Sequence, residues 1–536
     1  MAELLLAHAD ADRPAMLFED QRWTWPEYVA GCAQRAALLA DRLPAGAHPH
    51  VGVLLDNTPE YAMWLGAAIL SGTTVVGINQ TRRGDELARD VRHADCAMLV
   101  TDSALAPLTA GLDLGVATGQ VHVSDSPEYA ELLAPYAGAP VPRQDIDPAA
   151  LLLLLFTSGT SGTPKAVRCT QGRLAGISLA VTQMFALTQD DVCYIAMPMF
   201  HSNALMAGWG PSVAAGATAA LRRKFSASGF LADVRRFGAT YANYVGKPLS
   251  YVLATPEQPD DADNPLRRVF GNEGATEDLA RFERRFGCVV TDGYGSTEGG
   301  ASVRRVPDMP AGAFGVLTDG LSVRDQDTGA VCPRAVFDDN GRLLNGDEAV
   351  GELVNEQGGA AFEGYWKDED ATAARVREGA YWTGDLVYAD ADGFLWFAGR
   401  TDDWLRVDGE NIAAAPIERL LVRHPDVMLA AAYAVPDPVA GDQLMVALWL
   451  HDGAAFDPDE FATFLTAQPD LATTWVPRFV RVGELPMTPT GKVLKRQLRT
   501  ERWETEDVWW RPAKDPHFIP LPADERAKLD ITLSRR

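Results

Sequence analysis

Short apolar runs alternate with amphipathic segments along the chain up to about residue 330. Five runs are rich in β-branched or small apolar residues and have the length of buried strands: 51–55, 74–78, 97–101, 192–197 and 217–221. Three segments between them are typical of helices: 60–70, 84–93 and 225–237. Buried strands that alternate with helices indicate α/β layers with largely parallel sheets. We therefore predict layered α/β subdomains over this part of the chain.

The pattern changes after residue 318. Short segments broken by Gly, Asn and Asp run from 318 to 397 and predict a β-rich subdomain. A boundary is expected near 399–403, and the α+β pattern beyond it has helices at 416–422 and 457–465 with strands at 428–435 and 444–450. Four prolines between 512 and 522 favour an irregular tail from about 507. We predict a large N-terminal domain, residues 1–400, and a small mobile α+β C-terminal domain, residues 401–536.

Composition excludes several partners without changing this picture. A chain of 536 residues is too long for one core, and 47% apolar with 23% charged residues is ordinary for a globular protein. A formal net charge of −25 argues against nucleic acid or an anionic membrane as the main partner. The six scattered cysteines contain no C-x-x-C pair, which favours a reducing cytoplasm over a disulfide framework or a zinc site. We find neither a signal peptide nor a transmembrane run.

The segment 156–165 carries the clearest chemical signal. It reads Phe-Thr-Ser-Gly-Thr-Ser-Gly-Thr-Pro-Lys and follows a buried strand predicted at 149–155. Its glycines allow backbone N–H groups to approach an anion, its hydroxyls add donors, and Lys165 supplies a positive charge. It is not a Walker A loop, because Lys165 lies three residues past Gly162 and Ala166 follows it. We predict a phosphate grip of another kind; the alternative is a Ser/Gly-rich surface turn.

Four further clusters could complete a nucleotide site. Residues 292–300 offer Tyr294 for stacking on a base, hydroxyls for phosphate, and the Glu298 carboxylate for Mg²⁺. The others are Thr-Gly-Asp at 383–385, the segment 399–412, and Pro-Thr-Gly-Lys at 489–492. Taken singly, each of them is also typical of a turn, a linker or a solvated basic surface.

Taken together and in this order, the clusters resemble the adenylate-forming superfamily of acyl-CoA synthetases, nonribosomal adenylation domains and luciferases. The resemblance runs from about residue 15 to 505 and includes Met-Pro-Met-Phe-His-Ser-Asn at 197–203. Residues 222–228 and 242–248 are similar to those of actinobacterial fatty-acid–CoA ligases associated with steroid side-chain breakdown. The resemblance implies that MgATP and a carboxylic acid form an acyl-adenylate with release of pyrophosphate. Coenzyme A (CoA) then displaces AMP.

The resemblance also implies roles for individual residues. Lys492, Thr297 and Glu298 would be catalytic, and Glu298 and Thr157 would hold Mg²⁺. The nucleotide would contact Thr157, Ser158, Gly159, Thr160, Ser161, Gly162, Lys165, Gly271, Asn272, Glu273, Gly274, Tyr294, Gly295, Ser296, Thr297, Asp385 and Arg400. His201, Trp209 and Gly409 would lie on the acyl or CoA side. The C-terminal domain would rotate about Asp402 between the two half-reactions.

The acid is expected to be hydrophobic. Phe200 is followed by His-Ser-Asn, without the carboxylate that pairs with an amino acid's ammonium group in amino-acid-activating relatives. The apolar stretch 204–210 would suit a fatty or steroid acid; the alternative is a buried helix with no pocket. Two alternatives stay open: delivery to a carrier-protein phosphopantetheine, and a non-catalytic acyl- or nucleotide-binding relative. A homodimer also stays open.

Overall fold

The computed structural model describes all residues except 44–45, 118, 158–164, 275, 307, 311, 339–342, 401–403, 408–409, 438–440, 469–470, 472–474, 489–490, 506, 513–516, 527–528 and 530–536. The chain forms two compact units. The first comprises residues 1–299 and 360–374, and the second comprises 300–359 and 375–536. The predicted boundary at 400/401 falls inside the second unit, so a separate domain from 401 stays a prediction. Within the described residues, no helix has the length and apolar character needed to cross a membrane.

The first unit contains two sheets of mostly parallel, buried strands. One has the order β13-β12-β11-β9-β10-β1-β2, in which β2 alone pairs antiparallel. The other has the order β6-β5-β3-β4-β7-β8, and β7 and β8 form an antiparallel hairpin. The strands of the first sheet are β1 (Pro14–Phe18), β2 (Gln21–Thr24), β9 (Val192–Ile195), β10 (Thr218–Leu221), β11 (Tyr241–Val245), β12 (Arg268–Asn272) and β13 (Val289–Gly295). Those of the second are β3 (His50–Leu54), β4 (Thr74–Gly77), β5 (Met98–Thr101), β6 (Val121–Val123), β7 (Leu151–Thr157) and β8 (Lys165–Thr170).

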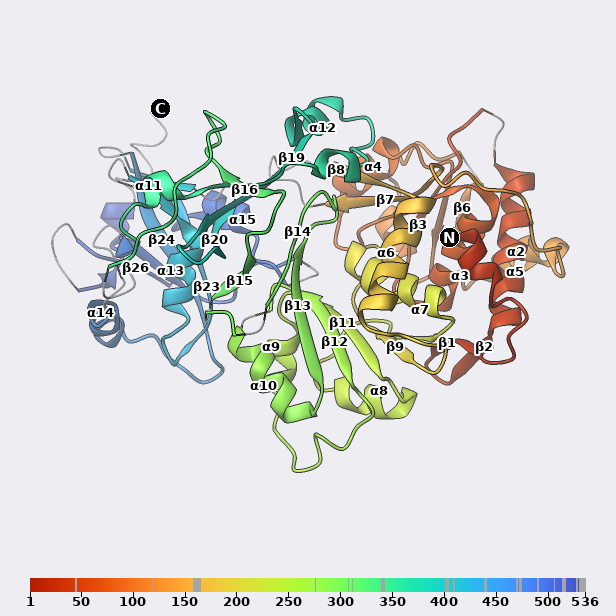
Figure 1. Ribbon diagram of the computed structural model, residues 1–536, viewed down its shortest axis with the longest axis horizontal. Coiled ribbons are helices and arrows are strands. Elements are labelled where there is room, and N and C mark those ends of the chain that lie inside the picture. Colours follow the sequence, from red (N-terminus) through yellow and green to blue (C-terminus); the bar gives the residue numbers. More distant parts are fainter. Residues whose placement is uncertain are drawn as a thin grey trace. The chain divides into compact units, whose positions relative to one another are not determined.

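Helices cover the faces of both sheets. Figure 1 shows α6 and α7 between the two sheets, where they share one hydrophobic core with α2, α3 and strands of both. On the other face of the second sheet, α4 packs its apolar residues against β3, β4 and β5. Helices α8, α9 and α10 lie beside β11 to β13 (Figure 1). The helices are α1 (Ala2–Leu6), α2 (Trp25–Arg42), α3 (Pro59–Ser71), α4 (Gly84–His93), α5 (Pro127–Leu133), α6 (Gln171–Met184), the π-helix η3 (Ala204–Trp209), α7 (Gly210–Ala215), α8 (Phe230–Phe237), α9 (Pro248–Leu253), α10 (Thr276–Phe286) and α12 (Glu369–Arg375).

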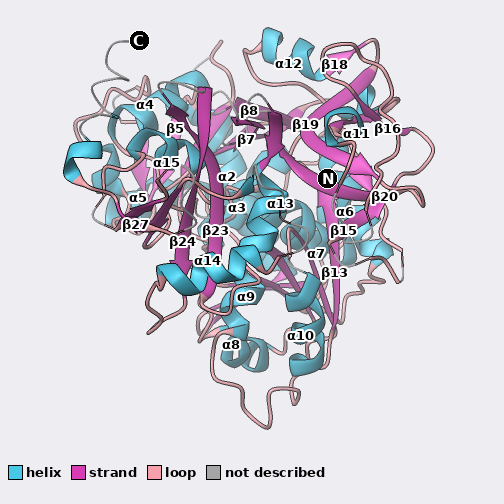
Figure 2. Ribbon diagram, turned by 90° about the vertical axis from the view of Figure 1, so that its left-hand side faces the viewer, coloured by secondary structure: helices cyan, strands magenta, loops and turns pink. Residues whose placement is uncertain are grey.

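The second unit also contains two sheets. One has the order β15-β20-β19-β17-β16, with β18 on β19; the other has the order β22-β21-β24-β25-β26-β27, with β23 on β24. Helices α13 and α14 pack on one face of the latter sheet, beside β23 and β24 in Figure 2, and α15 packs on the opposite face. The elements are β14 (Ser302–Val303), β15 (Ala313–Val316), β16 (Leu321–Arg324), α11 (Gly346–Ala349), β17 (Gly351–Asn355), β18 (Val376–Arg377), β19 (Ala380–Ala389), β20 (Phe394–Arg400), β21 (Trp404–Val407), β22 (Glu410–Ala413), α13 (Ala414–Leu421), β23 (Val427–Asp437), β24 (Gly441–Leu450), α14 (Pro458–Thr466), β25 (Phe479–Val482), α15 (Lys495–Glu501), β26 (Val508–Trp510) and β27 (Ile519–Pro520).

The structure confirms the α/β layers and the β-rich part, and it corrects two details. Helix α8 begins at Phe230 rather than at 225, because Ser226 accepts a hydrogen bond from the backbone N–H of Gly229 in a turn. The tail from 507 is not irregular throughout: β26 and β27 extend the sheet, and Trp509 packs against Phe456. The apolar side chains of this segment pack on the sheet and form strands in spite of the prolines.

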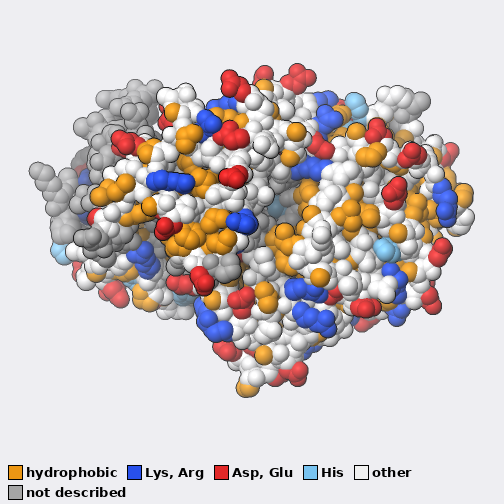
Figure 3. Space-filling view, in the orientation of Figure 1, with side chains coloured by type: hydrophobic (Ala, Val, Ile, Leu, Met, Phe, Trp, Pro, Cys, Tyr) orange, Lys and Arg blue, Asp and Glu red, His pale blue; other side chains and the backbone are white. Residues whose placement is uncertain are grey.

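On the face drawn in Figure 3, acidic and basic side chains are interspersed.

Candidate active site

The two ends of the predicted phosphate loop lie side by side. Thr157 ends β7 and Lys165 begins β8, and the two residues are direct partners in the antiparallel hairpin. The Thr157 hydroxyl lies 3.5 Å from the carbonyl oxygen of Lys165. Residues 158–162 of the predicted grip lie outside the described residues. The hairpin thus fixes where the loop leaves the sheet and where it returns.

Thr297 and Glu298 are held by residues from three other segments. The Ser202 hydroxyl lies 2.8 Å from the Thr297 hydroxyl, and the Arg173 guanidinium donates to the Thr297 carbonyl at 2.5 Å. The Tyr365 hydroxyl donates to Glu298 Oε1 at 2.9 Å. Thr297, the predicted α-phosphate contact, and Glu298, the predicted metal ligand, are therefore each held in place by neighbouring side chains. Gly295 and Ser296, just before them, are exposed.

The loop that follows β9 is fixed by a buried asparagine. Asn57 donates to the Met197 carbonyl at 2.8 Å and accepts from the Met199 N–H at 2.8 Å. Farther along this loop, Asn203 donates to the Tyr244 carbonyl at 2.8 Å, and the Asn203 N–H lies 3.3 Å from Nδ1 of His201. The half-buried ring of His201 is thereby held at the start of η3.

The predicted adenine wall, residues 271–274, continues from β12. Asn272 donates to the Gly293 carbonyl at 2.7 Å, which ties the wall to β13, the strand that carries the half-buried Tyr294. Gly271 needs to lack a side chain, because a Cβ there would lie 2.3 Å from the Tyr244 carbonyl oxygen. This close approach of two neighbouring strands explains the glycine at the position.

One buried carboxylate holds the far end of this wall. Asp292 Oδ2 accepts from the Gly274 N–H at 2.8 Å and from the Tyr244 hydroxyl at 2.5 Å. Between Asn272 and Gly274, Glu273 adopts the left-handed conformation, with φ of 67°. A non-glycine residue in this region costs roughly 1–3 kcal/mol, and it persists only where neighbouring contacts enforce it. Asp292 supplies one such contact.

In the second unit, Asp385 lies on β19 directly opposite Arg400 of β20. Asp385 is buried, and its N–H donates to the Thr383 hydroxyl at 3.1 Å. Glu352 accepts from the N–H of Gly384 at 2.5 Å, and burial raises the pKa of Glu352 above its ordinary value. The Arg400 side chain lies outside the described part of the structure. The backbone of the Thr-Gly-Asp segment is therefore held by hydrogen bonds from Gly384 to Glu352 and from Asp385 to Thr383. The contact with ribose stays a prediction.

Lys492 is joined to Thr488 by two hydrogen bonds in the second unit. The Thr488 N–H donates to the Lys492 carbonyl at 2.7 Å, and the Lys492 N–H donates to the Thr488 hydroxyl at 3.0 Å. Three residues after Lys492, Lys495 at the start of α15 forms an ion pair of 2.8 Å with Glu418 of α13. The backbone of Lys492 is thus held by Thr488, close to an ion pair between α15 and α13. The predicted hinge Asp402 and the predicted CoA contact Gly409 lie outside the described residues.

The structure therefore brings Thr157, Lys165, Thr297 and Glu298 together in the first unit, with the predicted adenine wall on neighbouring strands of the same unit. Lys492 and Asp385 belong to the second unit, and their part in the same site stays a prediction. Sequence reasoning missed Asn57, Arg173 and Tyr365. Their partners are far away in sequence, as with the 67 positions between Tyr365 and Glu298, and no local pattern indicates such pairs.

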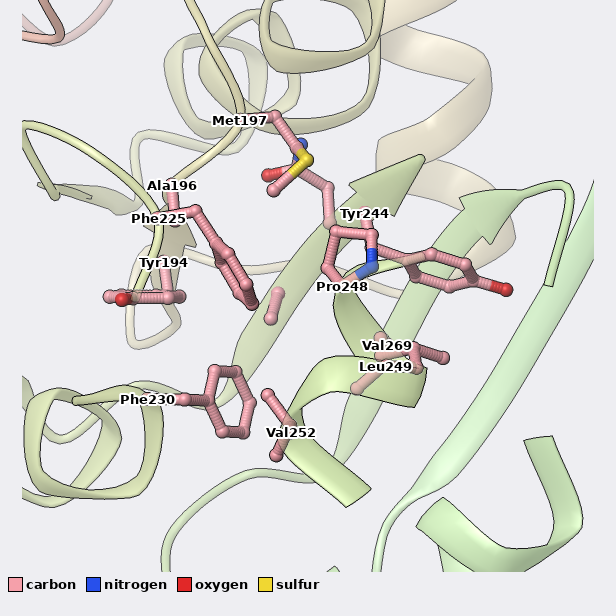
Figure 4. A pocket seen from close by; sticks show the side chains of 12 residues that line it. Tyr194, Ala196, Met197, Phe225, Phe230, Tyr244, Pro248, Leu249, Val252 and Val269 are labelled. Carbon is pink, nitrogen blue, oxygen red and sulfur yellow. The ribbon is translucent and has the colours of Figure 1, made fainter. Parts of the chain in front are cut away.

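A narrow apolar cavity lies between the first sheet and helices α8 and α9 (Figure 4). Its volume is about 10 Å³, room for roughly one water molecule. The Tyr194 hydroxyl donates to Asp233 and the Tyr244 hydroxyl to Asp292, so both phenols are satisfied by carboxylates. The lining residues are Tyr194, Ala196, Met197, Phe225, Phe230, Ala242, Asn243, Tyr244, Pro248, Leu249, Val252 and Val269.

The cavity and the predicted acyl residues do not coincide. Trp209 is fully buried in the core, its exposed fraction being 1%, and neither it nor His201 is among the described lining residues. The stretch 204–210 is mostly buried: η3 occupies 204–209, and Tyr241 donates to its Ala207 carbonyl at 2.6 Å. The apolar stretch is thus a packed helix, and the acyl roles of His201 and Trp209 stay predictions.

The chain is similar over nearly its whole length to several known proteins. The chain is 50% identical over 535 residues to the steroid-22-oyl-CoA synthetase of Rhodococcus jostii, covering 99% of this chain and 96% of that protein. It is 50% identical over 515 residues to the medium/long-chain-fatty-acid–CoA ligase FadD17 of Mycobacterium marinum, covering 96% and 98%. The fold is similar to that of ATP-bound MatB from Rhodopseudomonas palustris, with a TM-score of 0.78, 23% identity, and coverage of 94% and 99%.

Two family models match consecutive parts of the chain. Residues 6–366 match the AMP-binding enzyme model, and residues 416–492 match the AMP-binding enzyme C-terminal domain. The first match contains the β7–β8 hairpin and the Thr297–Glu298 site, and the second ends at Lys492. The chain belongs to the family of AMP-binding enzymes.

Proposed function

We propose that the protein is an ATP-dependent acid–CoA ligase that activates a hydrophobic carboxylic acid, a fatty acid or a steroid side-chain acid. The observation that carries this proposal is 50% identity over nearly the whole chain to a steroid-22-oyl-CoA synthetase. In the first half-reaction the substrate carboxylate attacks the α-phosphorus of ATP, and pyrophosphate leaves. In the second, the CoA thiol attacks the acyl carbonyl and AMP leaves.

Such transfers depend on positioning and charge neutralisation rather than on a covalent protein intermediate. The Thr157–Lys165 hairpin would hold the β- and γ-phosphates, and Thr297, fixed by Ser202 and Arg173, would contact the α-phosphate. Lys492 would stabilise the charge that develops between the carboxylate and the α-phosphate. After adenylation, rotation about Asp402 would withdraw Lys492 and bring Gly409 toward CoA.

The residues around Glu298 fit a magnesium ion. Within the described residues, no group of three or more His, Cys, Asp or Glu side chains is arranged to hold a metal. Mg²⁺ is commonly held by one or two carboxylates together with phosphate oxygens and water, and this fits a single fixed carboxylate. Glu298, aided by Thr157, would therefore hold Mg²⁺ together with ATP. When bound, Mg²⁺ neutralises phosphate charge.

The acyl tail would enter the cavity beside α8 and α9, since its lining is almost wholly apolar. At about 10 Å³ the cavity is far too small for a fatty chain or a steroid ring. Phe225 belongs to the irregular segment before α8 and points into the cavity (Figure 4). We propose that its ring moves aside when the acid binds.

The test supplies ATP, Mg²⁺, CoA and each of a panel of fatty, aromatic and steroid side-chain acids. Pyrophosphate exchange reports adenylation, and mass spectrometry reports the acyl-CoA. We expect both signals with long-chain or steroid acids. Exchange without any acyl-CoA would favour delivery to a carrier-protein phosphopantetheine instead. Absence of exchange with every acid would favour a non-catalytic binding protein.

We also propose a reducing, cytoplasmic location. All six cysteines are free thiols, and five of them are buried. Free thiols persist in reducing compartments.

A further inference from the structure

Tyr365 lies between the two charged side chains that the proposed function assigns to the phosphates and the metal. Its hydroxyl donates to Glu298 Oε1 at 2.9 Å, and the Lys165 ammonium lies 5.2 Å from the centre of its ring. The tyrosine is buried, with an exposed fraction of 5%. One side chain therefore contacts a carboxylate through its polar end and a cation through its ring face.

The segment that carries Tyr365 is tied to β8, the strand that begins at Lys165. The Arg168 N–H donates to the Gly364 carbonyl at 3.1 Å, and the Trp366 N–H donates to the Ala166 carbonyl at 2.8 Å. These bonds align residues 364–366 along the edge of β8, opposite Val167. The backbone that carries Tyr365 is thus set in register with the strand that carries Lys165.

The residue after Tyr365 anchors the same segment on its other side. The Trp366 indole N–H donates to Asp95 at 3.1 Å, and its ring packs edge-on against His48 and His50, with ring centres 5.1 and 4.8 Å away. The Tyr365 N–H also donates to the Thr372 hydroxyl at 3.0 Å. The backbone of residues 364–366, the Trp366 indole and the Tyr365 amide are all fixed by these contacts. The Tyr365 phenol therefore has little freedom to leave Glu298.

We propose that Tyr365 is a positioning residue that keeps Lys165 and Glu298 apart and available for MgATP; this inference rests on the proposed function. A lysine and a carboxylate close together tend to form an ion pair, which would neutralise both groups before ATP arrives. The structure shows no ion pair between these two described side chains. The phenol instead holds the carboxylate by a hydrogen bond and faces the ammonium with its ring, and a cation is attracted to an aromatic face.

Two substitutions separate the two contacts. Tyr365→Phe keeps the ring beside Lys165 and removes the hydrogen bond to Glu298. Tyr365→Leu removes both and opens the space between the charges. Isothermal titration calorimetry with ATP in the absence of acid and CoA, with and without Mg²⁺, reads binding without turnover. Mg²⁺ should raise the affinity for ATP by a factor, and we expect that factor to be about tenfold smaller in Tyr365→Phe than in the native protein. The affinity for ATP without Mg²⁺ should be unchanged. We expect Tyr365→Leu to weaken both.

Tyr129→Phe is the matched control, because Tyr129 also donates to a half-buried carboxylate, Glu60, away from this site. It should bind MgATP like the native protein. Glu298→Gln supplies the second test: if Tyr365 acts through Glu298, adding Tyr365→Phe to that variant should change Mg²⁺-dependent binding less than twofold. The proposal would be overturned if Mg²⁺ raised the ATP affinity of Tyr365→Phe as much as that of the native protein. It would also be overturned if the two substitutions lowered Mg²⁺-dependent ATP affinity independently in the double variant. A native protein that binds no MgATP would instead contradict the proposed function.

Discussion

Replacing Asp292 by alanine tests whether the strained adenine wall is held by its carboxylate. Asp292 Oδ2 accepts two hydrogen bonds in a buried setting, from Tyr244 and from Gly274. A hydrogen bond to a charged group contributes about 1.5–3 kcal/mol, so the free energy of unfolding should fall by about 3–6 kcal/mol. The bond to Gly274 also holds Glu273 at φ 67°. If the hydrogen bond to Gly274 stabilises this conformation of the wall by about 2 kcal/mol, its loss should lower the affinity for ATP roughly 30-fold.

The assay is calorimetric titration with MgATP, with thermal unfolding followed in parallel. Tyr244→Phe removes one of the two bonds and should lower stability by about half as much. Asp261→Ala is the matched control: Asp261 is also buried and accepts from the Gln258 N–H and from Arg285, on a segment that we assign no role in ATP binding. It should lose stability and keep its ATP affinity. Native ATP affinity in a folded Asp292→Ala variant would refute the reasoning.

Three further results are expected. Lys492→Ala should lower adenylation about 10²–10³-fold while thioester formation from supplied acyl-AMP survives; equal loss of both would exclude a lysine that serves one half-reaction. Phe225→Ala should widen the cavity and raise kcat/KM for bulky acids about tenfold relative to short ones, measured by acyl-CoA formation; an unchanged ratio would place the tail elsewhere. Burial raises the pKa of Asp90 to about 6 despite Arg82 and Arg89 nearby, so its ionised form is disfavoured in the folded state. The free energy of unfolding should therefore decrease by about 2 kcal/mol as the pH rises from 4 to 7, and chemical denaturation of Asp90→Asn should show this decline removed.

The amino-acid sequence predicts the layers of the first unit well, because its strands are continuous apolar runs and several of its helices begin at a capping Ser or Thr. Helix α2 shows this: Thr24 caps it through Glu27, a local signal that any reader of the sequence can find. The hairpin of Thr157 and Lys165 was also within reach, since the loop lies between two apolar runs.

Other parts of the site depend on distant contacts. Nothing near Tyr365 in the sequence indicates that it meets Glu298, because the two are joined only when residues 360–374 pack against β8. The stretch 204–210 was ambiguous for a related reason: an apolar helix has the same composition whether it packs solidly or lines a cavity. The cavity itself needs side chains from β9, β11, α8 and α9, and their depth is set by packing that no local pattern encodes.

Tyr244 belongs to two places at once: its ring lines the apolar cavity, and its hydroxyl holds the carboxylate that fixes Gly274. A ligand that displaces this ring would alter the geometry that ATP meets. By thermodynamic reciprocity, the acid would change the affinity for ATP by the same factor as ATP changes the affinity for the acid. The hydroxyl bond limits that factor to roughly 10- to 150-fold. One phenol would thus couple the binding of the two substrates through the protein, in addition to the direct contact that they make during adenylation.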